Sequence, residues 1–265
     1  MTDLSTKRAE LERILYAHAP LMVAYSGGVD STCLLAVAHA VLGDRVVGVI
    51  ADSPSLPRAT LADALGVAKD LGVAIEVVQT TEMDDPDYAA NPLNRCYFCK
   101  AELFRSMDAL ASKREFAAIA YGENADDPAH LRPGSQAAAE FSVLAPLKQA
   151  GLTKSDVRAL SKALNLPTAD APAQPCLSSR IPHGTPVTRE TLGFVERGEA
   201  AIKALGFRVF RVRFSAGIPP GARMLAGQDE LDRALSRAAE IRAALQGAGF
   251  GEVIVDPDGY PASAQ

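Results

Sequence analysis

The chain has 265 residues, 48% of them hydrophobic and 22% charged, a composition typical of folded globular proteins and unlike that of disordered ones. Its formal net charge of −5 argues against a protein whose main function is to bind nucleic acid. No apolar run approaches the roughly 20 residues that cross a bilayer. The polar N-terminus is followed by a helical pattern and is unlike a secretory signal, so we expect a cytoplasmic protein.

The first 165 residues alternate between the spacing of helices and short apolar runs typical of buried strands. The predicted helices are 4–17, 30–42, 58–71, 97–113 and 153–164. The predicted strands are 21–25, 46–51, 73–79 and 117–121. Residues 80–95 are polar and are predicted to form a loop. This alternation predicts an α/β domain with a parallel, doubly wound sheet that binds its ligand at the C-terminal ends of the strands.

A proline-rich segment, residues 166–187, separates this pattern from the rest of the chain and is interpreted as a domain junction that also carries function. Residues 188–265 predict a smaller α+β domain. Its predicted elements are a helix, strands at 209–214 and 222–226, a helix at 229–247 and a strand at 252–256. The expected domains are therefore 1–165 and 188–265.

The most specific short motif is residues 26–32 (SGGVDST), between the first predicted strand and the following helix. Two glycines let the backbone turn tightly and approach a ligand, and the N-terminus of the helix offers N–H groups to an anion. The motif lacks the lysine of a Walker A loop and is not G-x-G-x-x-G. A plain turn is the alternative, but the combined strand, glycines, acid and hydroxyls favour a phosphate-binding loop.

This loop resembles the pyrophosphate loop of the N-type ATP pyrophosphatases, which bind ATP, normally with Mg²⁺, and adenylylate a substrate. The resemblance implies ATP contacts from the loop, from the end of the second strand and from the segment after the fourth. The ATP-binding residues so implied are Ala24, Ser26, Gly27, Gly28, Asp30, Ser31, Asp52, Ser53, Gly122 and Asp127.

The four cysteines raise separate questions. Cys96 and Cys99 form a C-x-x-C motif, which suits a redox pair, half of a zinc site or part of an iron–sulfur site. There is no second C-x-x-C and no histidine close by in sequence. Cys33 is expected in the core. Cys176, in the proline-rich segment, is either a small buried side chain or a reactive thiol.

Further segments resemble the LarE family over nearly the whole chain. They are 52–57 (DSPSLP), 95–100 (RCYFCK), 122–127 (GENADD), 132–134 (RPG), 175–180 (PCLSSR) and 211–213 (RVR). LarE proteins take part in synthesis of the nickel-pincer nucleotide. The resemblance implies that ATP adenylylates a carboxylate of pyridinium-3,5-biscarboxylic acid mononucleotide and that sulfur then replaces the activated oxygen.

The same resemblance implies roles for residues of the second domain. Cys176 matches the sulfur-bearing cysteine, with Arg180 and Glu199 beside it as catalytic residues. Arg211 and Arg213 alternate on a strand and so share a face, which suits the substrate phosphate. A solvated strand face is the alternative for the arginines, and a helix surface for Glu199.

The sulfur source stays open between two possibilities. Cys96, Cys99 and Cys176 resemble the three-cysteine pattern of members that carry a [4Fe–4S] cluster, whereas in other members the cysteine gives up its own sulfur and becomes dehydroalanine. Leu225 stands where family members often have an acid, which puts a metal or oligomer contact in question.

The expected partner is a small-molecule nucleotide, with no nucleic acid or membrane, and the family implies a homo-oligomer. Two other readings remain. One is a different adenylylating enzyme, for tRNA thiolation or amidation; the acidic chain and the lack of a glutaminase domain disfavour it. The other is a nucleotide-binding module without catalysis.

Overall fold

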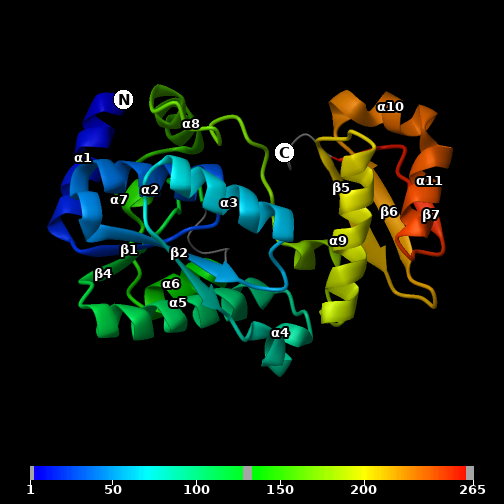
Figure 1. Cartoon of the computed structure of the whole chain (residues 1–265), viewed down its shortest axis with the longest axis horizontal. Helices are drawn as coiled ribbons and strands as arrows, with labels where there is room; N and C mark the ends of the chain where they lie inside the picture. Colours follow the sequence, from blue (N-terminus) through cyan, green and yellow to red (C-terminus); the bar gives the residue numbers. More distant parts are fainter. Residues whose placement is uncertain (1–2, 128–132, 261–265) are drawn as a thin grey trace. The chain divides into compact units, whose positions relative to one another are not determined.

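A computed structural model describes residues 3–127 and 133–260 (Figure 1). Its contacts divide the chain into two compact units. The first comprises Met1–Glu82 and Asn94–Ala171, and the second Met83–Leu93 and Pro172–Gln265. The division falls inside the proline-rich segment, but residues 83–93 join the second unit, whereas the sequence pattern had placed them in the first.

The first unit is built on a parallel sheet with strand order β3-β2-β1-β4, so the expected parallel α/β architecture is confirmed. Its strands are β1 (Leu21–Ala24), β2 (Val46–Asp52), β3 (Ile75–Gln79) and β4 (Ala118–Tyr121). In register, Leu21 of β1 lies between Val46 and Ala118. The centre of the sheet is buried because strands of parallel sheets are covered on both faces.

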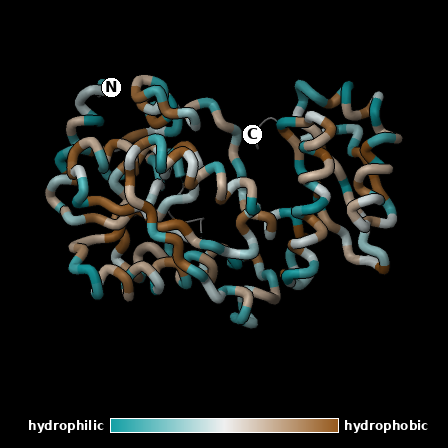
Figure 2. Tube along the Cα trace, viewed as in Figure 1, coloured by the Kyte–Doolittle hydropathy of each residue, from teal (hydrophilic) through white to brown (hydrophobic). Residues whose placement is uncertain are grey.

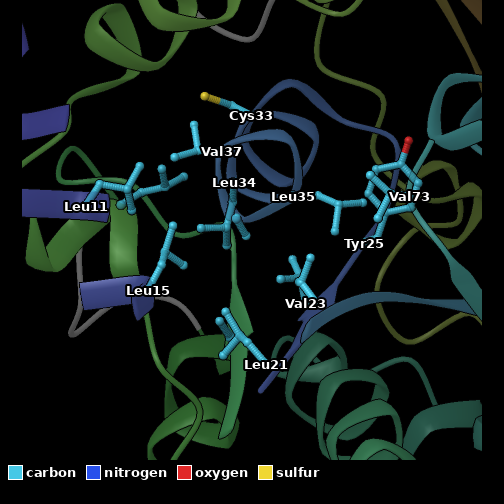
Figure 3. Close-up of a cluster of buried hydrophobic side chains, with 14 of the residues drawn as sticks. Leu11, Leu15, Leu21, Val23, Tyr25, Cys33, Leu34, Leu35, Val37 and Val73 are labelled. Atoms are coloured by element: carbon cyan, nitrogen blue, oxygen red, sulfur yellow. The ribbon is translucent and has the colours of Figure 1, made fainter. Parts of the chain in front are cut away.

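Helices cover both faces of this sheet (Figure 1). They are α1 (Leu4–Ala17), α2 (Val29–Leu42), α3 (Arg58–Asp70), α5 (Arg95–Arg114), α6 (Pro133–Glu140), α7 (Pro146–Gln149) and α8 (Lys154–Ala163). Side chains alternate along β1: Leu21 and Val23 pack in the core with α1 and α2, and Met22 packs with α5 and α6. Figure 3 shows the first of these cores, which also holds Cys33 as expected, and Figure 2 shows hydrophobic stretches along the strands at the centre of this unit.

The second unit has a three-stranded sheet. Its elements are α4 (Pro86–Ala89), a 3-10 turn (Leu177–Arg180), α9 (Arg189–Ala204), β5 (Phe210–Ser215), β6 (Gly221–Ala226), α10 (Leu231–Ser236), α11 (Ala238–Gly247) and β7 (Val253–Val255). β6 pairs antiparallel with β5 and parallel with β7. α9 packs on the sheet through Phe194, whose ring contacts Phe214 and Phe250.

Two sequence expectations need correction. The single helix expected at 229–247 is divided at Arg237, whose φ of −105° and ψ of 22° interrupt the helix while its side chain donates to the carbonyl of Leu205 at 3.0 Å. The loop expected at 80–95 contains α4, because Pro86 suits the first helical position and the Asp85 side chain accepts the N–H of Asp87.

Candidate functional site

The pocket of the first unit lies at the carboxyl ends of β1 and β4. The strand order reverses between these two strands, and in open α/β sheets ligands bind at such a reversal. The pocket has a volume of about 200 Å³. It brings together six of the residues implied by the ATP resemblance: Ala24, Ser26, Gly28, Asp30, Ser31 and Gly122.

The loop from Ser26 to Ser31 has the geometry of an anion cradle. Gly27 has φ +75°, and a Cβ there would lie 2.6 Å from the Cβ of Ala64, so only glycine fits. The Ser31 hydroxyl donates to the carbonyl of Gly28 at 3.1 Å and accepts the N–H of Ser26 at 3.2 Å. Gly28 is the N-cap of α2, which directs the first N–H groups and the positive end of its dipole towards the pocket.

Gly122 lets the chain leaving β4 pass against the start of α2. A Cβ at this position would lie 2.8 Å from the nitrogen of Ser31 and 3.0 Å from the carbonyl carbon of Asp30. Both atoms belong to the backbone, which cannot move aside as a flexible side chain would. The glycine after the fourth strand is thus required by close packing beside the loop.

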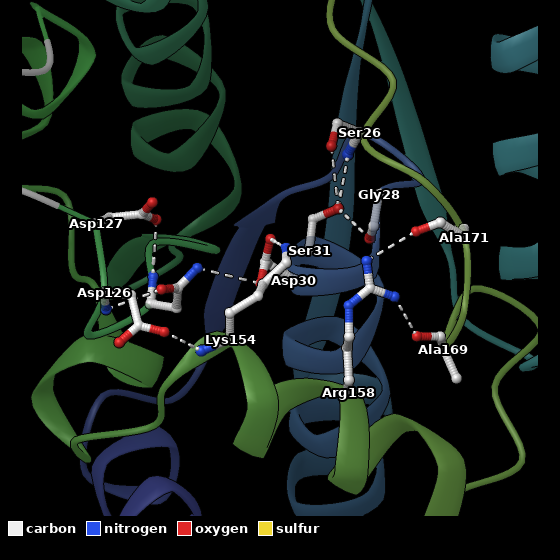
Figure 4. A network of polar contacts seen from close by, with 11 residues as sticks. Ser26, Gly28, Asp30, Ser31, Asp126, Asp127, Lys154, Arg158, Ala169 and Ala171 are labelled. Carbon is white, nitrogen blue, oxygen red and sulfur yellow. Dashed lines mark hydrogen bonds and ion pairs between the residues drawn. The ribbon is translucent and has the colours of Figure 1, made fainter. Parts of the chain in front are cut away.

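A polar network ties Asp30 to the segment after β4 (Figure 4). Asp30 forms an ion pair with Lys154, and its other oxygen accepts the side-chain amide of Asn124 at 3.4 Å. The Asp127 carboxylate accepts the backbone N–H of Asn124 at 3.2 Å, so it shapes this segment. Mg²⁺ on a nucleotide is usually held by phosphates and one or two carboxylates, and Asp30 is the carboxylate of this pocket that fits that role.

Asp52 is the last residue of β2 and Ser53 follows it directly, but neither lines the pocket. Asp52 is held by Arg58 and by the Gln79 amide at 2.7 Å, and the Arg58 hydrogen bond chiefly lowers its pKa. The Ser53 hydroxyl donates to the buried carboxylate of Glu82. Within the described residues the second oxygen of Glu82 has no hydrogen-bond partner.

Lys100 and Tyr121 line the same pocket, although neither is among the residues that the resemblance implies. The Lys100 ammonium lies 4.5 Å from the centre of the Tyr121 ring, a cation–π distance. The Tyr121 hydroxyl donates to Glu123, which also accepts the Ser135 hydroxyl at 2.6 Å. Burial, followed by the Glu123 carboxylate, raises the pKa of Tyr121. Lys100 is the last residue of the RCYFCK segment, and its position directly after the C-x-x-C motif is the sequence feature that pointed to a nearby site.

The two cysteines of the C-x-x-C motif lie in the first turns of α5. Cys96 is exposed and Cys99 is partly buried. Residues three apart on a helix share a face, so the pair can supply two neighbouring thiolates, as part of an iron–sulfur ligand set requires. Within the described residues of each unit, no three His, Cys, Asp or Glu side chains gather into a metal site.

Cys176 belongs to the second unit and is held there by Arg180. The buried guanidinium donates through Nη1 to the carbonyls of Pro175 at 2.6 Å and Cys176 at 3.1 Å. Its Nε and Nη2 donate to the two oxygens of Glu199 at 2.7 and 3.1 Å, a bidentate ion pair. Glu199 also accepts the N–H of Val212 on the edge strand at 3.2 Å. Both residues that the resemblance placed near Cys176 therefore fix the position of its backbone.

Residues 83–93 support the segment after Cys176 from the other side. The buried Tyr88 hydroxyl lies 2.8 Å from that of Ser178. The Asn91 amide donates to the carbonyls of Pro182 and Thr185, both at 2.9 Å. The sequence carries no local signal for these contacts, because about 90 residues separate the partners.

Arg211 and Arg213 differ in exposure and in the donors that they have free for a ligand. Arg211 is only 9% exposed, and its two terminal nitrogens donate to the carbonyls of Phe210 at 2.6 Å and Ala173 at 2.5 Å. Its guanidinium stacks 4.8 Å from the Tyr260 ring centre. Burial, and then the charge of Arg180, lowers the pKa of Arg211. Arg213 is exposed on the same face of β5.

Leu225 is buried and pairs with Arg211 across β5 and β6. Leu225 therefore offers no charge to Arg211, whose terminal nitrogens donate to backbone carbonyls. Arg132 of the RPG segment lies outside the described residues.

The fold and the pocket define an α/β protein with a glycine-containing loop at a switch point of its sheet, joined to a unit with a tightly held cysteine. No protein-family model matches the chain. It is 42% identical over 241 residues to an uncharacterized protein of Synechocystis sp., covering 90% of this chain and 89% of that protein. It is 31% identical over 261 residues to the pyridinium-3,5-bisthiocarboxylic acid mononucleotide synthase of Lactiplantibacillus plantarum, covering 98% and 94%. The chain belongs to the family of this synthase, the LarE family.

None of the helices that the structure describes is both long and apolar enough to cross a bilayer.

Proposed function

We propose that this protein is an ATP-dependent sulfur transferase of nickel-pincer nucleotide synthesis. It adenylylates a carboxylate of pyridinium-3,5-biscarboxylic acid mononucleotide, releasing pyrophosphate, and replaces the activated oxygen with sulfur. The chain is 31% identical to the Lactiplantibacillus plantarum synthase over 98% of its length, and this similarity supports a pyridinium mononucleotide as the substrate. The observation that carries the ATP-dependent step is the pocket at the switch point, where the 26–31 loop, Gly122 and Lys100 converge.

In the first step a carboxylate oxygen of the substrate attacks the α-phosphorus of ATP. The bond to the β-phosphate oxygen breaks, and pyrophosphate leaves. The N–H groups at the start of α2 and the Lys100 ammonium stabilise the growing negative charge on the phosphates. Bound Mg²⁺, held with the help of Asp30, would supply further positive charge to the same oxygens.

In the second step a sulfur nucleophile attacks the activated acyl carbon, and AMP leaves with the bonding electrons. If Cys176 is the donor, its thiolate first forms a thioester. Loss of the Cys176 Cα proton then breaks the Cβ–S bond, which leaves a thiocarboxylate on the substrate and dehydroalanine in the chain. Arg180 and Glu199 hold the Cys176 backbone in place for this attack.

The alternative sulfur source is a [4Fe–4S] cluster with Cys96, Cys99 and Cys176 as proposed ligands. Such a cluster would supply a bound sulfide in place of the cysteine sulfur, and three thiolates would leave one iron open for it. With free sulfide in the solution to reload the open iron after each transfer, the proposed enzyme would turn over repeatedly, whereas the sacrificial route allows one sulfur per chain.

The test incubates the protein with ATP, Mg²⁺ and pyridinium-3,5-biscarboxylic acid mononucleotide, and measures both pyrophosphate and the product by mass spectrometry. Cys176→Ala should release pyrophosphate but form no thiocarboxylate. Cys33→Ala, which removes a buried core thiol, should retain both activities and serves as the control. ATP binding without pyrophosphate release would support the non-catalytic module instead.

Iron and acid-labile sulfide, measured on protein purified without oxygen, separate the two sulfur sources. Both should be present in the wild type and absent from Cys96→Ala if a cluster is the donor. If iron stays absent after reconstitution, Cys176 is the donor, and the reacted chain should lack the elements of H₂S at that position.

A further inference from the structure

The Lys100 side chain crosses from one helix to another before its ammonium reaches the pocket of the first unit. It starts on α5, which packs beside α6 (Figure 1). A Cβ added to Gly134 of α6 would lie 2.6 Å from Cδ, 2.9 Å from Cε and 3.0 Å from Nζ of Lys100, so the lysine stem passes directly over this glycine. The ammonium then lies 4.5 Å from the centre of the Tyr121 ring on β4. Gly134 and the Tyr121 ring thus form two walls of a slot around the lysine, the Lys100 slot.

Gly134 is required by the lysine and not by its own backbone. It is buried within α6 and is not among the glycines with a positive φ. Alanine forms helices more readily than glycine, so helix stability alone would favour alanine at this position. The space beside Gly134 is instead filled by Cδ and Cε of Lys100. The glycine therefore gives up helix stability for room along the lysine stem.

The Tyr121 ring is fixed from its hydroxyl end and from its edge. The hydroxyl donates to the buried carboxylate of Glu123. The same carboxylate accepts the Ser135 hydroxyl at 2.6 Å, and Ser135 directly follows Gly134 in α6. The Phe104 ring packs edge-on against Tyr121 with 5.9 Å between the ring centres. One turn of α6 therefore makes room for the lysine and also anchors the ring on which its ammonium lies.

We propose that Gly134 and Tyr121 are positioning residues, which hold the Lys100 ammonium where the phosphates of ATP are bound. A lysine has a long flexible stem, so an unsupported ammonium samples many positions. A charge stabilises a reaction most when it is in place before the reaction begins. The slot supplies this restraint, and it gives the RPG segment, whose last residue is Gly134, a part in the ATP-dependent step. The inference rests on that proposed step.

Gly134→Ala tests the slot because the atoms in its way belong to a flexible side chain. The new methyl group should move the lysine stem and leave the backbone in place, so Tm should lie at or slightly above the wild-type value. With ATP, Mg²⁺ and pyridinium-3,5-biscarboxylic acid mononucleotide, the kcat for pyrophosphate release should fall by about tenfold, because misplacement of a reacting group by about 1 Å lowers rates strongly. Gly66→Ala, at an exposed position of α3 where a Cβ meets no atom within 4 Å, should keep the wild-type rate.

A double substitution shows whether the glycine acts through the lysine. Lys100→Gln should lower kcat by about a hundredfold through loss of the charge. Adding Gly134→Ala to Lys100→Gln should then change kcat by less than about twofold, because the effects of residues that act through one group are not additive.

Substitutions of Tyr121 separate the ring from its hydroxyl. Tyr121→Leu removes the ring face and should lower kcat by about tenfold. Tyr121→Phe should restore the rate, although it loses the bond to Glu123 and unfolds at a lower temperature. A purely structural role would make the more stable of Gly134→Ala and Tyr121→Phe also the more active, whereas the slot predicts the reverse.

Nuclear magnetic resonance follows the lysine without turnover. Protons above the face of an aromatic ring are shifted upfield, so the Lys100 signal of protein labelled with carbon-13 at lysine Cε should be shifted upfield and should be absent from Lys100→Gln. Gly134→Ala and Tyr121→Leu should each remove most of this shift.

Three results would overturn the inference: a wild-type kcat in Gly134→Ala, additive losses in the double variant, or an unshifted Lys100 signal in the wild type. Absence of pyrophosphate release from the wild type would refute the proposed function alone. The inference then depends on the Lys100 signal, which ATP and Mg²⁺ should move in the wild type and not in Gly134→Ala.

Discussion

Gly122→Ala adds a single methyl group where the chain leaving β4 touches the phosphate loop. The new Cβ would lie 2.8 Å from the Ser31 nitrogen, and ordinary contact begins near 3.4 Å, so the start of α2 must shift by about 0.6 Å. Overpacking of this kind costs about 1–3 kcal/mol. In a domain of this size each kcal/mol lowers Tm by about 2–4 °C. The shift also moves the N–H groups that we expect to bind the phosphates.

Thermal unfolding with and without ATP and Mg²⁺ measures both effects at once. Gly122→Ala should lower Tm in the absence of nucleotide and reduce the further rise that ATP produces. Gly66→Ala is the matched control, because its Cβ meets no atom within 4 Å and Gly66 is exposed on α3. In this control alanine should raise stability by up to about 1 kcal/mol. If Gly122→Ala matches the control in Tm and in ATP response, the packing argument for this glycine is wrong.

Three further substitutions test the polar contacts. Glu199→Gln should lower the free energy of unfolding by about 3 kcal/mol, because it leaves the buried Arg180 charge without its carboxylate partner; unfolding in urea measures this loss. The same substitution should abolish thiocarboxylate formation while pyrophosphate release continues. Asp156 has a pKa of about 2, lowered chiefly by Lys7, so its ionised form stabilises the fold above pH about 4 and loses that effect as the pH falls towards 2. Asp156→Asn should therefore cost about 1 kcal/mol at neutral pH and flatten the acid limb of a pH–stability profile, and an unchanged limb would contradict this. Tyr121→Phe should lower stability by about 2 kcal/mol through loss of its bond to a carboxylate yet leave the KM for ATP unchanged, since the ring beneath the lysine remains.

The elements of the first unit could be predicted because their signals are local. The helix at residues 4–17 and the strands of the parallel sheet follow from apolar spacing, and the start of the helix at 154–163 follows from the Thr153 cap. The break at Arg237 could not be predicted, because the alanine-rich sequence around it suits a continuous helix and the interruption depends on a carbonyl at Leu205. The short helix at 86–89 had a proline and an N-cap as signals, but its polar context favoured a loop.

The part of the site that could be predicted from the sequence is the part where a motif needs glycine for its backbone geometry. Gly27 and Gly122 belong to the motifs of the resemblance, and the structure gives the steric reason why each is a glycine; of the two, Gly122 lines the pocket. Lys100 was not singled out, because its place directly after the C-x-x-C motif indicates a nearby site but gives no role to the lysine itself. Strand alternation indicated that Arg211 and Arg213 share a face, but it does not reveal that carbonyls occupy Arg211.

The assignment of residues 83–93 to the second unit means that the backbone passes between the units three times: after Glu82, after Leu93 and after Ala171. The second unit is therefore discontinuous in sequence. During synthesis, residues 83–93 emerge about 80 residues before the segment from Pro172 onward that they contact. Such non-local pairing slows folding. A fragment that begins at Pro172 would lack Tyr88 and Asn91 and would leave the chain after Cys176 without its support. Limited proteolysis near Leu93 should consequently loosen a segment that lies some 85 residues further along the chain.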